Sequence, residues 1–187
     1  MARVPYLKPE EASGELRETL EAIPKNLVGL VAQAQGVAGP HLSLIGALLA
    51  KTNLDPVLRE MTILLVGRRT GAEYEWNQHV GIASRAGVRE DQIEAIEQGE
   101  IGAGCCDAPA RAVLAFAAQL LQGLRPDEPC FQALKTEAHL NEREIVELVL
   151  LVGTYQALAM LMTSLDIELD ESVDAAEFAG LLDHMNR

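Results

Sequence analysis

The sequence has few aromatic residues and no extended run of alternating β-branched residues. Phe, Trp and Tyr together make up 4% of the 187 residues, while Ala, Leu and Glu recur with helical spacing in segment after segment. Half-buried strands depend on aromatic and β-branched side chains at alternate positions. Their scarcity argues against a β-rich fold, and we predict an all-α fold.

Basic residues are also scarce. The chain has 15 Lys and Arg against 28 Asp and Glu, which gives a formal net charge of −13. A surface of this sign repels nucleic acid and anionic lipid alike. We therefore expect neither nucleic acid nor a membrane surface as a partner.

Cysteine is limited to three residues, Cys105, Cys106 and Cys130. An odd number with two adjacent members suits neither a secreted disulfide framework nor a paired metal site. Residues 1–10 contain two prolines and a lysine and lack the apolar run of a secretory signal. We expect a cytoplasmic protein.

One run, from Ile145 to Leu165, is long and apolar enough to suggest a membrane span. Glu147 and Gln156 interrupt it, acidic residues follow it, and no Lys or Arg cluster anchors its far end. We interpret it as a helix that is buried in the core or in a subunit interface.

With 49% hydrophobic residues the chain can bury a core, and we predict a single domain over residues 1–187. Gly, Pro and Asn punctuation separates the predicted helices. These are Glu11–Ala22, Leu27–Gln35, His41–Thr52, Pro56–Arg69, Ala72–Ala86, Glu90–Glu97, Ala108–Gln122, Pro129–Ala138, Asn141–Asp166 and Val173–Asn186. The sequence LLVG occurs at 64–67 and again at 150–153. A duplication that produced two similar helical halves and a chance recurrence explain this repeat equally well.

The second half of the helical hairpin predicted over residues 54–88 carries Glu75 and His79, four residues apart and so on one face. A carboxylate beside an imidazole is the arrangement that acid–base catalysis requires, but an exposed pair with little effect has the same spacing. Glu60 favours the first interpretation. It stands next to the apolar run 61–66, where a buried acid needs a partner. We predict that the three side chains approach one another, and that repulsion between the two carboxylates raises the pKa of one of them.

The order of motifs over this stretch resembles the carboxymuconolactone decarboxylase family, which shares the alkylhydroperoxidase D scaffold. The resemblance rests on Leu-Asp-Pro-x-Leu-Arg-Glu at 54–60, Tyr-Glu-Trp-x-x-His at 74–79, Ala-Gly-Val at 86–88 and a long late helix with Tyr155. It implies an all-α helical bundle and an assembly of three or six identical chains. We therefore expect a homotrimer or a homohexamer.

In alkylhydroperoxidase D the corresponding frame has a glutamate, then Cys-x-x-Cys, then a histidine. The resemblance places the glutamate at Glu60, the two cysteines at Ala72 and Glu75, and the histidine at His79. A thiol peroxidase needs one cysteine to attack the peroxide and a second to form the disulfide. The missing pair disfavours that activity.

The resemblance then implies a lyase of the decarboxylase type acting on a small cyclic acid or lactone. A peroxiredoxin-like antioxidant and a non-catalytic oligomer that binds a small molecule remain as alternatives. We predict His79, Glu60 and Glu75 as catalytic residues and Tyr74, Tyr155 and Arg59 as substrate-binding residues. No metal or other cofactor is expected, since HExxH spacing and a second matched histidine are lacking. Two ionised glutamates would repel a carboxylate substrate unless an arginine faces inward.

Overall fold

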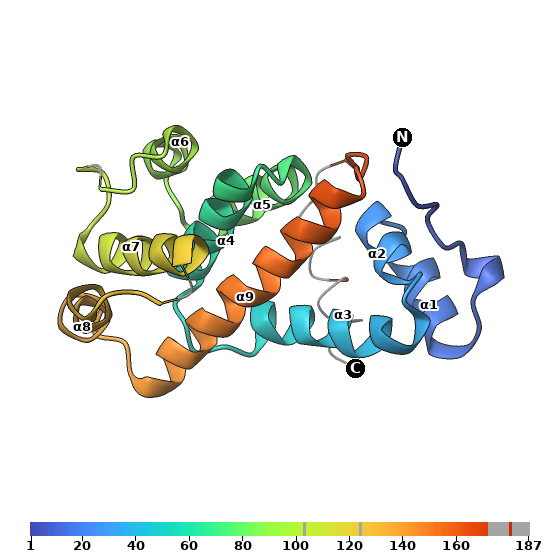
Figure 1. The fold of residues 1–187 in the computed structure, drawn as a ribbon, viewed down its shortest axis with the longest axis horizontal. Coiled ribbons are helices and arrows are strands. Elements are labelled where there is room, and N and C mark those ends of the chain that lie inside the picture. Colours follow the sequence, from blue (N-terminus) through green and yellow to red (C-terminus); the bar gives the residue numbers. More distant parts are fainter. Residues whose placement is uncertain (103, 124, 172–179, 181–187) are drawn as a thin grey trace. The chain divides into compact units, whose positions relative to one another are not determined.

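The computed structural model describes residues 1–102, 104–123, 125–171 and 180 (Figure 1). Within these residues the chain forms one short 3-10 helix, Pro9–Glu11, and nine α-helices. The α-helices are α1 Gly14–Ala22, α2 Asn26–Val31, α3 Gln35–Ala50, α4 Pro56–Thr70, α5 Glu73–Ala86, α6 Glu90–Gln98, α7 Ala108–Gly123, α8 Glu128–Thr136 and α9 Glu142–Ser164. The predicted all-α fold is confirmed.

Most of the observed helices lie within a few residues of the predicted ranges, but α3 starts earlier than expected. No predicted helix covers residues 36–40, which include two glycines and Pro40, whereas α3 begins at Gln35 and contains Pro40. Its buried face includes Ala38, in the segment that was predicted to lie outside the helix. The helix predicted over residues 173–186 lies outside the described residues.

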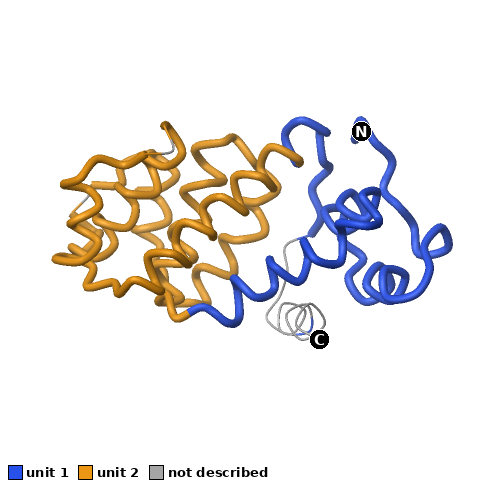
Figure 2. The backbone as a smooth tube through the Cα atoms, turned by 60° about the horizontal axis from the view of Figure 1, so that its bottom comes forward, with its two compact units in different colours: residues 1–52, 162–187 blue, residues 53–161 orange. Residues whose placement is uncertain are grey.

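The chain divides into two compact units, residues 1–52 with 162–187 and residues 53–161 (Figure 2). In the first unit, the segment after α9 is held by contacts with the first 30 residues. Arg3 pairs with Asp166 at 2.6 Å, and the backbone N–H of Asn26 donates to Asp170 at 2.7 Å. The single domain expected from chain length stays a prediction.

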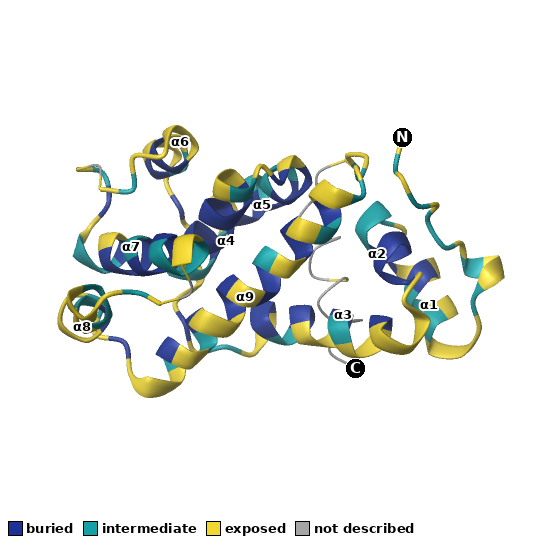
Figure 3. Ribbon diagram, in the orientation of Figure 1, coloured by how far each residue is buried: buried dark blue, intermediate teal, exposed yellow. Residues whose placement is uncertain are grey.

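Helix α4 forms the centre of the second unit, and it packs against α5, α6 and α7. Every residue from Glu60 to Gly67 is buried, so this stretch of α4 has no face in contact with water (Figure 3). A helix that is apolar on all sides fits such a position. The local sequence fixes both of its ends, because Asp55 accepts the N–H groups of Val57 and Leu58 and Gly71 ends the helix with φ of 70°.

Helix α9 is long and apolar enough to cross a membrane by length and composition, and 44% of its apolar window is buried in the structure. Asn141 caps the start of this helix, because its side chain accepts the backbone N–H of Glu144 and its own backbone N–H donates to the Glu144 carboxylate. One side of the helix is exposed and apolar. It carries Val146, Val149, Leu150 and Met160, with exposed fractions from 41% to 59%.

Candidate functional site

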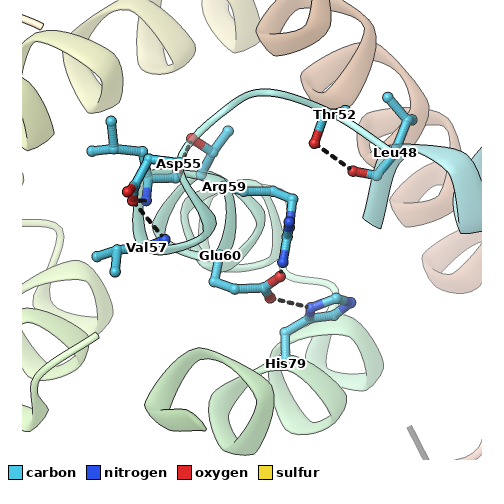
Figure 4. A network of polar contacts seen from close by, with 9 residues as sticks. Leu48, Thr52, Asp55, Val57, Arg59, Glu60 and His79 are labelled. Carbon is cyan, nitrogen blue, oxygen red and sulfur yellow. Dashed lines mark hydrogen bonds and ion pairs between the residues drawn. The ribbon is translucent and has the colours of Figure 1, made fainter. Parts of the chain in front are cut away.

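Glu60 lies at the centre of the candidate site, with its side chain fully buried (Figure 4). Its two carboxylate oxygens have different partners. His79 Nδ1 lies 2.9 Å from Oε2, and Arg59 Nε–H donates to Oε1 at 3.0 Å. The expected approach of Glu60 and His79 is therefore present in the second unit, between helices α4 and α5.

The turn between the two helices brings these residues together. Gly71 adopts the left-handed conformation that a residue with a Cβ rarely enters, which lets α5 fold back along α4. The two helices approach closely at Gly67. A Cβ on Gly67 would lie 3.3 Å from the Trp76 backbone nitrogen and 3.4 Å from a carboxylate oxygen of Glu75. Sequence analysis missed Gly67, although a glycine inside an apolar helix is a signal of close packing.

The partners of Glu60 keep it ionised in a buried position. Burial by itself raises the pKa of this carboxyl group. The hydrogen bond and charge of His79, followed by those of Arg59, lower the pKa by more than burial raises it, so that the net pKa lies below the usual value. An ionised carboxylate only accepts hydrogen bonds, so Nδ1–H of His79 donates to it. This leaves Nε2 as the ring nitrogen that is able to take or give a proton.

Glu75 is buried as well, but it does not join this network. Glu75 is 3% exposed, and no described residue forms a hydrogen bond with either of its carboxylate oxygens. Burial raises its pKa well above the usual value. The pKa of one glutamate was expected to be raised, and this is so for Glu75. The cause is loss of water on burial, however, and not repulsion by the carboxylate of Glu60.

The charge of the site is therefore smaller than two glutamates suggested. Glu60 is negative and has the positive Arg59 beside it, while the buried Glu75 favours its neutral form. The expected repulsion of an acidic substrate is reduced accordingly.

The three residues predicted to bind substrate lie in the second unit. Arg59 contacts Glu60, and Tyr74 is buried near the start of α5. The ring of Tyr155, on α9, meets the His79 ring edge to face at a centroid distance of 5.3 Å. Burial raises the Tyr155 pKa well above its usual value, and the negative charge of Glu60, and of Glu75 when it is ionised, adds to the effect. Tyr155 therefore lies within electrostatic range of both glutamates.

Glu147 is a second residue whose role the sequence analysis missed. Its carboxylate accepts the backbone N–H groups of Asn53 and Leu54, at 2.7 and 3.1 Å, and Arg143 donates to it at 2.7 Å. These bonds attach the segment before α4 to α9. An acid inside an otherwise apolar helix was the available signal, but its partners lie 93 and 94 residues away.

All three cysteines are free. The Cys106 thiol is buried, and burial together with neighbouring Cys105 raises its pKa to about 11. Burial also raises the pKa of Cys130. Thiols with raised pKa are poor nucleophiles at neutral pH. Among the described residues, no group of three or more His, Cys, Asp or Glu side chains is arranged to hold a metal ion.

Residues 42–119 match the model of the carboxymuconolactone decarboxylase family. This segment belongs to that family. The family segment contains Glu60, Glu75 and His79, so the resemblance seen in the sequence is confirmed over the candidate site. No curated protein matches the chain.

Solved structures of similar fold extend the likeness beyond the family segment. An alkylhydroperoxidase AhpD core, a peroxidase-related protein from Ralstonia eutropha JMP134, has a TM-score of 0.77 at 15% identity and covers 96% of each chain. A peroxidase-related protein from Silicibacter sp. TM1040 has a TM-score of 0.71 at 16% identity, covering 83% of this chain and 82% of its own. The debrominase Bmp8 has a TM-score of 0.70 at 18% identity and covers 96% of each chain. At these identities the similarity concerns the fold, which is AhpD-like.

Proposed function

We propose that the chain is an acid–base enzyme of the carboxy-lyase type, acting on a small cyclic acid or lactone with His79 as the proton carrier. The observation that carries the proposal is the buried hydrogen bond of 2.9 Å between His79 Nδ1 and Glu60. A carboxylate on one ring nitrogen fixes the tautomer and the orientation of the ring, which leaves Nε2 available for proton transfer.

In the proposed reaction the bond between the substrate ring and its carboxylate breaks, and CO₂ leaves. The electron pair stays on the ring carbon and is delocalised into the adjacent unsaturated or carbonyl group. The imidazolium of His79 gives its Nε2 proton to that carbon, and the neutral imidazole regains a proton from water. Glu60 orients the ring throughout, while Arg59, Tyr74 and Tyr155 are the proposed contacts for the substrate.

The family's thiol peroxidase chemistry has less support. Ala72 and Glu75 stand where the resemblance places the two cysteines, and neither side chain can form a disulfide. The debrominase and peroxidase-related structures share the fold with this chain, and their names are no guide to its substrate.

We also propose that the chain works as a homotrimer or homohexamer in the cytoplasm. The exposed apolar side of α9 and the absence of disulfides among the three cysteines support this setting. As part of the same proposal, Ile145 to Leu165 serves as a core and interface helix rather than as a membrane span.

The test is release of CO₂ from a panel of small cyclic keto acids, unsaturated acids and carboxylated lactones, in D₂O. The proposal expects CO₂ and a product with one deuterium on the former carboxyl-bearing carbon. His79→Gln should abolish both, while His41→Gln, on α3 in the other unit, should abolish neither. Equal rates in wild type and His79→Gln would overturn the proposed role of His79. Binding of panel members without turnover would instead support the non-catalytic alternative.

A further inference from the structure

The buried carboxyl group of Glu75 stands out in the second unit because it has no hydrogen-bond partner among the residues that the structure describes. Neither oxygen forms a hydrogen bond with a described residue, although the residue is only 3% exposed. A buried polar group without a hydrogen bond is costly, and most buried polar groups in native proteins have one. An unpaired group of this kind is expected where a ligand supplies the missing partner.

The neighbours of Glu75 place it beside the acid–base pair. It lies one helical turn before His79 on α5, so both side chains project from the same face of that helix. Tyr155 lies beside both residues: its ring meets the His79 ring edge to face, and its hydroxyl group is close enough to Glu75 for an ionised carboxylate there to raise the Tyr155 pKa. A small molecule that reaches His79 Nε2 would therefore come close to Glu75.

Burial decides which hydrogen bond Glu75 can form. Loss of water favours the neutral carboxyl group, and none of the described cations lowers the pKa of Glu75. A neutral carboxyl group carries an O–H donor, which an ionised carboxylate lacks. Glu60, by contrast, is held ionised by Arg59 and His79 and only accepts. The two glutamates thus offer opposite hydrogen-bonding properties within one site.

We propose that Glu75 is a ligand-binding residue whose buried carboxyl O–H donates a hydrogen bond to an sp² oxygen of the molecule bound beside His79. The sp² oxygen belongs to a carbonyl or a carboxylate group. The inference rests on the proposed function for the position of the ligand. It adds the donor that recognises the ligand, a different task from the proton transfer at His79.

Two small probes distinguish the sources of such an oxygen: acetate carries it with a charge, and acetamide carries it without one. Each is titrated into the full-length protein, and its affinity is obtained from the rise of the unfolding temperature with probe concentration. The variants are Glu75→Leu, which removes the donor, and Glu75→Gln, which keeps an N–H donor but cannot ionise. Glu73→Gln is the matched control, since Glu73 lies exposed on the same helix.

Wild type, Glu75→Gln and Glu73→Gln should bind at least one probe, and Glu75→Leu should bind it roughly tenfold more weakly because one buried hydrogen bond is lost. Affinity of the wild type should fall as pH rises and Glu75 ionises, while affinity of Glu75→Gln should stay constant above pH ~6, where acetate is fully charged. A purely structural role of Glu75 would not produce this difference in pH dependence.

The inference is overturned if Glu75→Leu binds as tightly as the wild type, if wild type and Glu75→Gln share one pH profile, or if the wild type binds neither probe. The outcomes for the proposed function are separate. Probe binding that depends on Glu75, without CO₂ release from any panel substrate, would support the inference and count against the lyase. Turnover that depends on His79 and is unchanged in Glu75→Leu would support the lyase and count against the inference on Glu75.

Discussion

The Oε2 atom of Glu60 lies 2.9 Å from Nδ1 of His79, although 19 residues separate them in the chain. Both side chains are at least nine-tenths buried. Water therefore competes little for this hydrogen bond, and breaking it from either side should have a measurable effect.

Replacing His79 by Gln should abolish turnover on a confirmed substrate and leave the assembly intact. Glutamine approximately keeps the size of the side chain and its ability to donate to Glu60, but it cannot carry a proton at neutral pH. Turnover and light scattering, measured on the same preparation, check the two parts. Unchanged turnover would show that the pair is structural.

Replacing Glu60 by Gln should lower the stability of the protein by about 2–4 kcal/mol at neutral pH, because the Arg59 side chain, 11% exposed, loses its charged partner. Since folding lowers the pKa of Glu60, its contribution is present above the usual carboxyl pKa and is lost as pH falls through the folded value. Urea unfolding at several pH values should show the wild type losing its advantage over Glu60→Gln in acid. An advantage that is constant with pH would contradict the ionised state of Glu60.

Glu75 should influence stability with the opposite sign. Folding raises its pKa, so its contribution is fully present below the ordinary value of 4.5 and is lost as pH rises through the folded value. As pH rises from weakly acidic to alkaline values, the free energy of unfolding should therefore fall less for Glu75→Gln than for the wild type. Parallel curves would show that Glu75 is ionised in the folded protein.

The apolar side of α9 should mediate assembly. We expect light scattering to give a mass of three or six times 20.2 kDa for the wild type, and a smaller mass for Leu150→Glu, because Leu150 is 50% exposed within that side. Leu169→Glu is the control, as Leu169 is 55% exposed outside α9. A wild-type species of 20.2 kDa at micromolar concentration would contradict the expected oligomer.

No thiol-dependent peroxidase turnover is expected. The raised pKa of Cys106, about 11, leaves little thiolate at neutral pH, and the matched positions hold Ala72 and Glu75. The measurement is consumption of an alkyl hydroperoxide with a dithiol reductant. Steady turnover that is lost in the double variant Cys105→Ser, Cys106→Ser would show that the adjacent thiols are active.

The sequence was most informative where local chemistry decides the structure. The helix predicted from Pro56 begins where α4 begins, because the Asp55 cap involves only residues two or three positions away. Glu60 next to an apolar run pointed to a buried partner, and the hairpin predicted over residues 54–88 indicated the helix that would supply it. Glu60 and His79 could therefore be paired before the structure was seen.

Features set by tertiary packing were harder to predict. The i, i+4 spacing of Glu75 and His79 gave no sign that Glu75 would be buried without a hydrogen bond, because that depends on the closeness of α4 at Gly67. The early start of α3 was missed for a similar reason: burial of Ala38 outweighs the weak helix propensity of the glycines around it.

The pairing of Arg59 with Glu60 has a mechanical consequence. Both residues belong to α4, so this helix carries its own counter-ion for the buried carboxylate. If α5 moved away to admit a substrate, Glu60 would lose its bond to His79 but keep its bond to Arg59. Separation of the two helices would therefore not leave Glu60 as an isolated buried charge, which is costly to keep away from water. The counter-ion of Glu60 would thus stay with α4 and not depend on the position of α5.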